Sequence, residues 1–264
     1  MYDFISDFKP VEGEEPLDRY VPDGGLTSIL RNVACIGDSL SSGEFESCDD
    51  HNCVGYHDMF EFSWGQFLAR MSGIEVRNFS RGGMTAREYL EEFADQKGLW
   101  GDDKLCRAYI IALGVNDLLN SDTDLGTIGD ADTNERRDTF CWYYSQIIKK
   151  IKKIQPKARI FLMTIPRCGW EDRDVISKNH ADLLNKLSEK FEFTYVIDLF
   201  RYGPVYDIDF FSRFFLAGHM NAAGYLFTAR IVASYIDYII RNNWQDFSQI
   251  AFVGTPWHNV HAKW

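Results

Sequence analysis

The sequence NVACIGDSLSSG, residues 32–43, joins an apolar run to a polar turn that is rich in serine and glycine. Its first five residues lack period-two alternation, which is typical of a strand covered on both faces. A serine at a tight, glycine-assisted turn from strand to helix points outward over the sheet edge, close to N–H groups of the helix. Ser39 therefore has the exposure and the nearby donors that a nucleophile requires. The alternative is that Asp38 and Ser39 only cap a helix.

Four more apolar runs follow, separated by helical patterns. The runs are residues 74–79, 107–113, 158–164 and 193–198, and the helical patterns lie near residues 63–72, 85–95, 138–154, 173–190 and 222–241. Strands that alternate with helices predict right-handed crossovers and a parallel sheet with helices on both sides. Ligands of such sheets bind beyond the carboxyl ends of the strands. Polar residues directly after each run are therefore the first candidates for a functional site.

Three further segments fit this expectation. Residues 78–85, NFSRGGMT, contain paired glycines that let the backbone approach a ligand closely. In GVND, residues 114–117, the Asn116 carboxamide is suited either to donate to a developing negative charge or to begin an Asx turn. Far downstream, His219 lies in GHMNAAGY, residues 218–225, directly before a helix-start pattern. This position allows the imidazole to return to the same sheet edge.

Together these four segments resemble the blocks of the SGNH, or GDSL-type, hydrolases, which are named for a Ser, Gly, Asn and His in separate blocks. The resemblance spans roughly residues 32–241. It implies an α/β fold: a three-layer α/β/α, flavodoxin-like sandwich with a five-stranded parallel sheet. It also implies that Ser39 is the nucleophile and His219 the base. The N–H groups of Ser39 and Gly83, with the side chain of Asn116, would form the oxyanion hole.

The sequence departs from the family at one position. The family usually has an Asp three residues before the catalytic His, and this chain has Leu216 there. Three explanations remain open: a backbone carbonyl accepts the His219 proton, Asp207 or Asp209 reaches the ring as the orienting acid, or the site is impaired or repurposed. We favour a working enzyme, because loss of the orienting acid lowers the rate without removing oxyanion stabilisation.

The function predicted from these residues is a serine esterase that hydrolyses short-chain acyl esters. An O-acetylated carbohydrate is an attractive substrate, because Trp64, Trp100 and Trp170 lie in or near strand-end loops and sugars stack on such rings, although tryptophans also fill cores. A lipid substrate is less favoured, since no amphipathic lid helix is apparent. The alternatives are a non-catalytic SGNH-like module that binds a glycan or a protein partner, and an acyltransferase. No cofactor is expected.

The composition and the N-terminal sequence bear on which partners the protein binds and where in the cell it lies. The net charge of −11 argues against nucleic acid, whose binding depends on Lys and Arg. No apolar run approaches the roughly 18 residues of a membrane span, and the acidic N-terminus does not look like a secretory signal. We therefore expect a cytoplasmic protein, or a secreted one if a leader has been removed. Residues 1–30 are expected to form an arm packed on a single domain, residues 31–264.

The segment after the nucleophile is a long insertion that we expect to overhang the substrate cleft. It contains Cys48, His51, Cys53 and His57, residue types that suit zinc. Their order, C-x₂-H-x-C-x₃-H, matches no structural zinc spacing known to us. We therefore expect no bound metal and, without a signal peptide, reduced cysteines.

Overall fold

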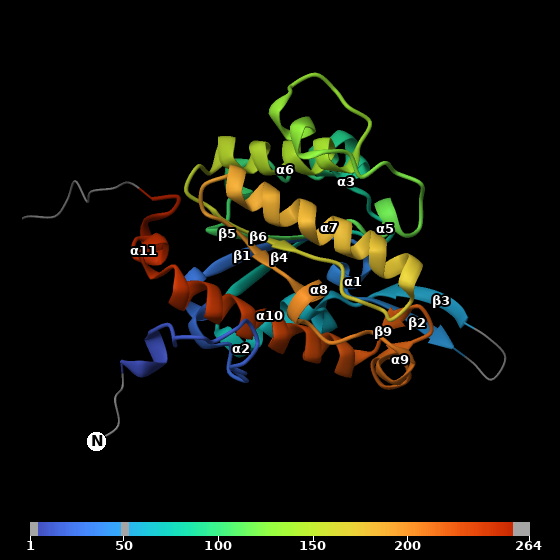
Figure 1. The fold of residues 1–264 in the computed structure, drawn as a ribbon, viewed down its shortest axis with the longest axis horizontal. Helices are drawn as coiled ribbons and strands as arrows, with labels where there is room; N and C mark the ends of the chain where they lie inside the picture. The colour runs from blue at the N-terminus through green and yellow to red at the C-terminus, as the bar shows by residue number, and fades with distance from the viewer. Residues whose placement is uncertain (1–4, 49–52, 256–264) are drawn as a thin grey trace, which may run out of the picture.

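The computed structural model describes residues 5–48 and 53–255, and a parallel sheet lies at its centre (Figure 1). The strands of this sheet are β1 Asn32–Gly37, β4 Glu75–Ser80, β5 Ala108–Ala112, β6 Arg159–Met163 and β7 Thr194–Ile197. They lie in the order β4-β1-β5-β6-β7, and every neighbouring pair is parallel. All five predicted strands are confirmed, as is the five-stranded sheet.

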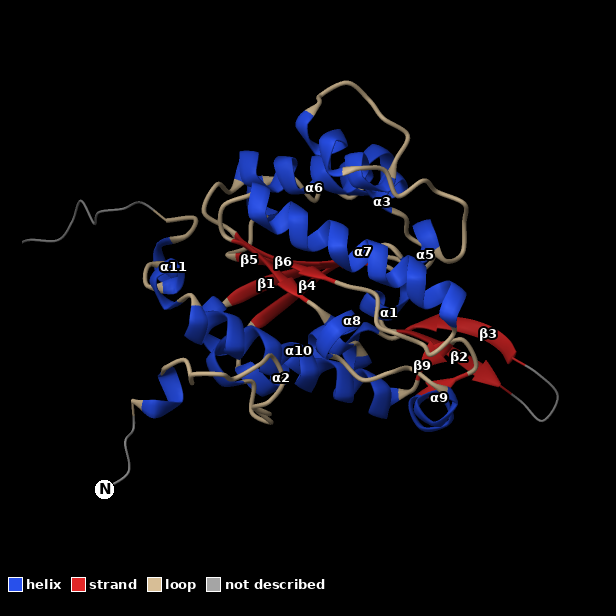
Figure 2. Ribbon diagram, viewed as in Figure 1, coloured by secondary structure: helices blue, strands red, loops and turns tan. Residues whose placement is uncertain are grey.

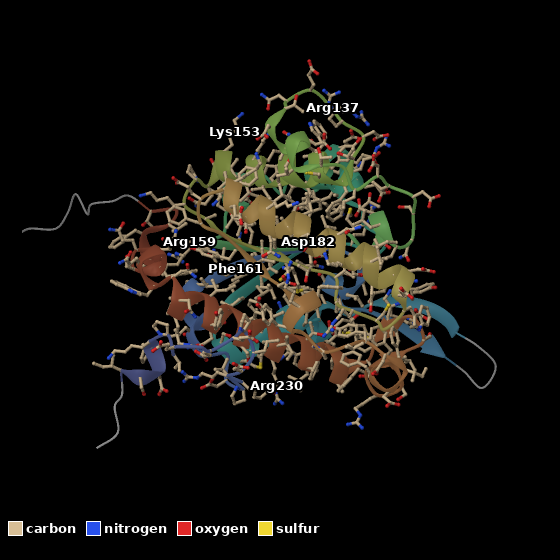
Figure 3. All side chains as sticks on the ribbon, in the orientation of Figure 1. Arg137, Lys153, Arg159, Phe161, Asp182 and Arg230 are labelled. Carbon is tan, nitrogen blue, oxygen red and sulfur yellow. The ribbon has the colours of Figure 1, made fainter. Side chains whose placement is uncertain are left out.

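Helices cover both faces of the sheet, so the predicted three-layer fold is also confirmed (Figure 2). On one face lie α3 Ala86–Glu88, α6 Phe140–Ile154 and α7 Glu171–Lys190; on the other lie α2 Trp64–Ser72 and α10 Ala222–Asn242. A hydrophobic core lies on each face of the sheet, because successive side chains of a strand point to opposite faces. In β5, Tyr109 and Ile111 belong to the core under α3, α6 and α7, whereas Ala108 and Ile110 belong to the core under α2 and α10. Figure 3 shows Phe161 of β6 in the interior, whereas Arg137 lies on the loop before α6.

Shorter elements connect these layers. They are α1 Ser39–Ser42, β2 Glu44–Cys48, β3 Cys53–Asp58, a π-helical turn Tyr89–Phe93, α4 Ala94–Gln96, α5 Val115–Leu118, α8 Leu199–Tyr202, α9 Ile208–Phe214, β8 Phe215–Leu216, β9 His219–Met220 and α11 Trp244–Phe247. Strands β2 and β3 form an antiparallel hairpin, and β8 and β9 form a second, very short one. Strand β2 packs against β8 and β9. The insertion after the nucleophile thus reaches the segment that carries His219.

The segment before β1 packs on α10. The Val21 N–H donates to the Ser234 hydroxyl at 3.0 Å, and the Leu26 N–H donates to Asp237 Oδ1 at 2.9 Å. The guanidinium of Arg241, whose side chain is fully buried, pairs with Asp237 and with Glu14 of the N-terminal segment. No helix among the described residues is long and apolar enough to cross a membrane.

Replacing Arg241 with Met should lower the free energy of unfolding by about 3–5 kcal/mol, because it leaves two buried carboxylates without their cation. Urea denaturation measures this loss. Arg19→Met is the matched control, since Arg19 pairs with Asp7 at a partly exposed site and such a pair contributes about 1 kcal/mol or less. Equal losses in the two variants would contradict a structural role for the buried cluster.

Candidate active site

Ser39 is the first residue of α1, two residues after the end of β1. The Asp38 carboxylate caps this helix by accepting the Leu40 N–H at 3.1 Å, so the capping interpretation holds for Asp38 while the Ser39 side chain stays partly exposed. A Cβ at Gly37 would collide with the Ser41 side chain, which explains the glycine. Burial raises the pKa of Asp38 to about 6. The turn is thus fixed by residues on both sides of Ser39.

The expected oxyanion donors lie on the strands that flank β1. Gly83 follows β4 with φ +72°, a left-handed conformation that favours glycine, and it is exposed. Asn116 follows β5; its Nδ2 donates to the Met84 carbonyl at 3.2 Å, and its Oδ1 accepts from Asn120 at 3.0 Å. Because the amide nitrogen carries two hydrogens, this arrangement fixes the side chain and leaves a second N–H for a ligand. The turns after β4 and β5 are therefore tied to each other beside Ser39.

Asp117, next to Asn116, also links the turns that follow β4 and β5. It is 1% exposed and accepts the Ala86 N–H at 3.0 Å. Burial, opposed by its backbone hydrogen bonds, raises the pKa of Asp117 to about 7. Asp117 has a structural role, since it joins the start of α3 to the start of α5.

The raised pKa of Asp117 predicts a pH dependence of stability. Between its ordinary value and about pH 7, the folded protein holds a proton that the unfolded chain has lost, so Asp117 makes stability fall as the pH rises. Asp117→Asn removes this contribution. Relative to wild type, the variant should gain about 2–4 kcal/mol in free energy of unfolding between about pH 5 and pH 8. Urea denaturation at both values tests this; a constant difference would show that Asp117 does not titrate as described.

His219 lies in β9 and is held by the β2–β3 hairpin. Element α1, which begins with Ser39, packs against β9. The imidazole Nδ1 lies 2.5 Å from Glu46 Oε1, and the same oxygen accepts the Gly218 N–H at 3.0 Å. Glu46 is 6% exposed. A carboxylate only accepts, so Nδ1 carries the proton and Nε2 is left as the site for a second partner.

That second partner is Glu44 in this structure. Glu44 Oε1 lies 3.3 Å from Nε2, and the same carboxylate sits against Gly82, where a Cβ would collide with it. Burial raises the pKa of Glu44. Among the described residues, the Ser39 hydroxyl makes no hydrogen bond to His219. Nε2 must therefore leave Glu44 to bind Ser39.

The two aspartates proposed as orienting acids lie elsewhere. Asp207 caps α9, its Oδ1 accepting the Phe210 N–H at 2.9 Å, and Asp209 is exposed in the first turn of that helix. The carboxylate beside Nδ1 is Glu46, which we did not predict. One signal was present: in β2 the residues Glu44 and Glu46 are two apart and so share a face of the strand.

The candidate zinc residues are only partly described. His51 lies outside the described residues, as do the side chains of Cys48 and Cys53. The His57 Nε2 is 2.8 Å from the Ser47 hydroxyl. Within the described part of the chain, no group of three or more His, Cys, Asp or Glu side chains is arranged to hold a metal. The described cysteines, Cys35, Cys106, Cys141 and Cys168, are free thiols.

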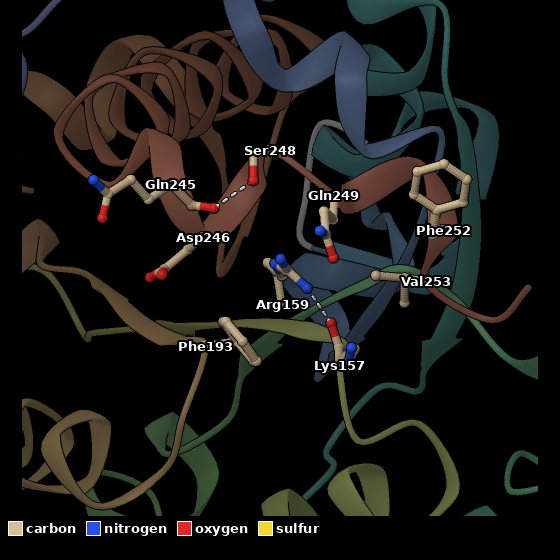
Figure 4. A pocket seen from close by; sticks show the side chains of 9 residues that line it. All are labelled: Lys157, Arg159, Phe193, Gln245, Asp246, Ser248, Gln249, Phe252 and Val253. Atoms are coloured by element: carbon tan, nitrogen blue, oxygen red, sulfur yellow. Dashed lines mark hydrogen bonds between the residues drawn. The ribbon is translucent and has the colours of Figure 1, made fainter. Parts of the chain in front are cut away.

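Two pockets lie at opposite ends of the sheet. The larger, of ≈ 650 Å³, lies at the carboxyl ends of β1, β5 and β6, and Asp38 and Gly218, neighbours of Ser39 and His219, line it. Of the three tryptophans considered for sugar stacking, Trp64 and Trp170 line this cavity, whereas Trp100 packs on Tyr89 of the core. The smaller pocket, of ≈ 230 Å³, surrounds Arg159 at the start of β6 (Figure 4).

A partly exposed serine thus lies at the carboxyl edge of a parallel sheet, and a carboxylate-bound histidine lies on a segment that packs against the helix beginning with that serine. This arrangement resembles the sites of hydrolases with an α/β/α fold. The family model described as "GDSL-like Lipase/Acylhydrolase family" matches residues 35–226. The chain belongs to this family, and it is a carboxylic ester hydrolase.

Solved structures with the same fold are distant in sequence. A family two carbohydrate esterase from Clostridium thermocellum, in complex with cellohexaose, has a TM-score of 0.57 at 16% identity, over 89% of this chain and 67% of that one. A protein from Lactobacillus plantarum has a TM-score of 0.59 at 15% identity, over 81% and 98% of the two chains. The acetyl xylan esterase AlAXEase has a TM-score of 0.51 at 18% identity, over 78% and 99%. No curated protein matches the sequence significantly.

Proposed function

We propose that this chain is a serine esterase in which Ser39 attacks the ester carbonyl and His219 is the general base. The observation that carries the proposal is the contact of His219 Nδ1 with Glu46 at 2.5 Å, on a segment that packs against the helix beginning with Ser39. Glu46 keeps the proton on Nδ1, so Nε2 is the ring atom that accepts one once it has left Glu44. Glu46 also stabilises the imidazolium that forms when it does.

The reaction then has two halves. His219 takes the Ser39 proton, Ser39 bonds to the carbonyl carbon, and the N–H groups of Ser39 and Gly83 with the Asn116 amide stabilise the oxyanion. His219 returns its proton to the leaving alcohol. Water, deprotonated by the same imidazole, releases the acid from Ser39. Glu44 competes for Nε2 in the free enzyme, and it has to release the imidazole before the first step.

For the substrate we propose esters of short acyl groups, with O-acetylated carbohydrate as the first candidate. Support comes from the printed names of two structures with this fold, a family two carbohydrate esterase bound to cellohexaose and an acetyl xylan esterase. The exposed ring of Trp170 beside the large cavity offers a surface on which a sugar can stack. An acyltransferase uses the same steps, with an alcohol in place of water.

A fluorophosphonate probe tests the nucleophile. We expect covalent labelling of the native protein at Ser39, loss of labelling in Ser39→Ala, and full labelling in the control Ser41→Ala. Absence of labelling of the folded protein would support the non-catalytic binding module instead. Acetylated xylan and p-nitrophenyl acetate then test the substrate, and release of the acyl group to an added alcohol in preference to water would identify a transferase.

A further inference from the structure

The smaller pocket, of ≈ 230 Å³, lies at the opposite edge of the sheet from Ser39 and is built around one arginine. Arg159 is the first residue of β6, so it lies at the amino end of a strand, whereas the candidate active site lies at carboxyl ends. Figure 4 shows Arg159 in the middle of the lining residues, between Phe193 and Gln249. The two pockets share no described lining residue, so this one is a separate candidate site.

Arg159 lacks the anion that a buried arginine normally has. Arginine side chains are almost never fully buried unless they are paired, and the buried Arg241 of this chain follows the rule with two carboxylates. Arg159 is only 3% exposed, yet no carboxylate among the described residues forms an ion pair with it. Asp246, which also lines the pocket, accepts instead from the Tyr195 hydroxyl at 2.6 Å.

Most of the donors of this guanidinium are unused. A guanidinium has five N–H donors. In the described part of the chain the one bond that it donates runs from Nη1 to the Lys157 carbonyl, and Nε is buried without a partner. Two aromatic rings take the place of an anion, since Cζ lies 4.3 Å from the ring centre of Phe193 and 5.6 Å from that of Phe247. Such contacts stabilise the charge but leave the N–H groups without acceptors.

A strained residue and a second cation lie beside Arg159. Phe193 has φ +54°, a left-handed conformation that is unusual for a bulky side chain and persists only where the surrounding structure imposes it. The Lys152 ammonium lies 5.6 Å from the centre of the same ring and donates to the Ala158 carbonyl at 2.8 Å. Burial, together with the charge of Arg159, lowers the pKa of Lys152 to about 7. An anion bound to Arg159 would relieve this repulsion between the two cations.

The lining selects among anions. The planar guanidinium matches a carboxylate or a phosphate through two parallel N–H groups. The Asp246 carboxylate lines the same pocket, and it repels a doubly charged phosphate more strongly than a singly charged carboxylate. Asp246 and the exposed amides of Gln245 and Gln249 are also suited to bind hydroxyl groups. The residues therefore fit a ligand with one carboxylate and several hydroxyls.

We infer that this pocket binds a sugar acid, with the carboxylate on Arg159 and the hydroxyls toward Asp246 and Gln249. Phe252, which is 50% exposed and lines the pocket, offers an apolar surface to the sugar ring. The volume of ≈ 230 Å³ lies below the range of about 300–1,000 Å³ for pockets that hold drug-sized molecules, so it suits a single monosaccharide. The inference does not depend on the esterase activity.

Calorimetric titration with D-glucuronate at low ionic strength tests the ligand. We expect saturable binding that is about tenfold or more tighter than that of D-glucose, which lacks the carboxylate and so cannot pair with the guanidinium. Inorganic phosphate should also bind more weakly than glucuronate. Equal binding of glucose would contradict the role of Arg159, and tighter binding of phosphate would overturn the carboxylate assignment.

Variants locate the binding. Arg159→Met should weaken glucuronate binding about tenfold or more, and the protein should still fold, because an apolar side chain of similar size replaces an unpaired buried charge. Gln249→Glu adds a negative charge at an exposed lining position and should weaken binding about fivefold. Gln96→Glu is the matched control: Gln96 is exposed at the end of α4, outside the pocket, and binding should stay unchanged.

The outcomes separate this inference from the proposed function. If glucuronate does not bind, or binds equally well to Arg159→Met, the sugar-acid site is wrong, whether or not the fluorophosphonate labels Ser39. If glucuronate binds as expected and Ser39 is not labelled, the esterase proposal fails and the site stands. Should Arg159→Met not fold, the comparison of Gln249→Glu with Gln96→Glu decides, and equal binding by these two variants would overturn the inference.

Discussion

Ser39→Ala should lower kcat for p-nitrophenyl acetate by about 10⁴-fold or more, because no other group takes over the attack on the carbonyl carbon. The loss should appear in kcat with little change in thermal stability, since the Ser39 side chain is partly exposed and its hydroxyl is not needed by the surrounding turn. Steady-state kinetics and thermal denaturation measure the two effects. The oxyanion donors remain in this variant, so residual hydrolysis above the rate in water is expected.

The double variant gives the sharper test. If Ser39 and His219 act as a unit, Ser39→Ala combined with His219→Ala should be no slower than either single variant. Multiplicative losses would mean that the two residues contribute independently. Retention of most activity in Ser39→Ala would assign the nucleophile to another side chain.

Glu46→Gln should lower kcat by about 10²- to 10⁴-fold while KM changes little. The amide keeps the shape of the carboxylate, but its N–H₂ group favours the tautomer in which Nδ1 accepts and Nε2 carries the proton. It also removes the negative charge that stabilises the imidazolium. Steady-state kinetics across pH measure the loss, and Glu46→Asp should recover part of it.

Two matched variants show whether the effect belongs to Glu46. Glu44→Gln makes the same change on the same strand, at the Nε2 side of the ring. We expect a far smaller change in kcat there, because Glu44 has to leave Nε2 before catalysis. Asp207→Asn tests the acid considered from sequence. A larger loss in Asp207→Asn than in Glu46→Gln would show that the hairpin contact is not the one used in catalysis.

The sheet and its layers could be predicted because they follow from local patterns. Runs such as residues 107–113 are apolar on both faces, and a strand of this kind has to be covered by helices on each side. The turns after these strands then meet at one edge, which brings Ser39, Gly83 and Asn116 to neighbouring positions. Their roles stay a prediction until the kinetics are measured.

Glu46 could not be predicted in the same way. Its position depends on the pairing of β2 with β3 and on the packing of β2 against β8 and β9, contacts between segments far apart in the chain. The alternation Glu44-Phe45-Glu46 indicates a strand but not what the strand packs against.

The hairpin that supplies Glu46 also explains why no acid is needed at position 216. The imidazole needs one anion at Nδ1, and Glu46 provides it from a strand close to the nucleophile in the chain, so an apolar, 42% exposed side chain is tolerated three residues before the histidine. We therefore expect the residues at positions 46 and 216 to vary together among relatives. Relatives should carry an acid at one or the other, and a chain acidic at neither should keep the architecture and hydrolyse esters more slowly.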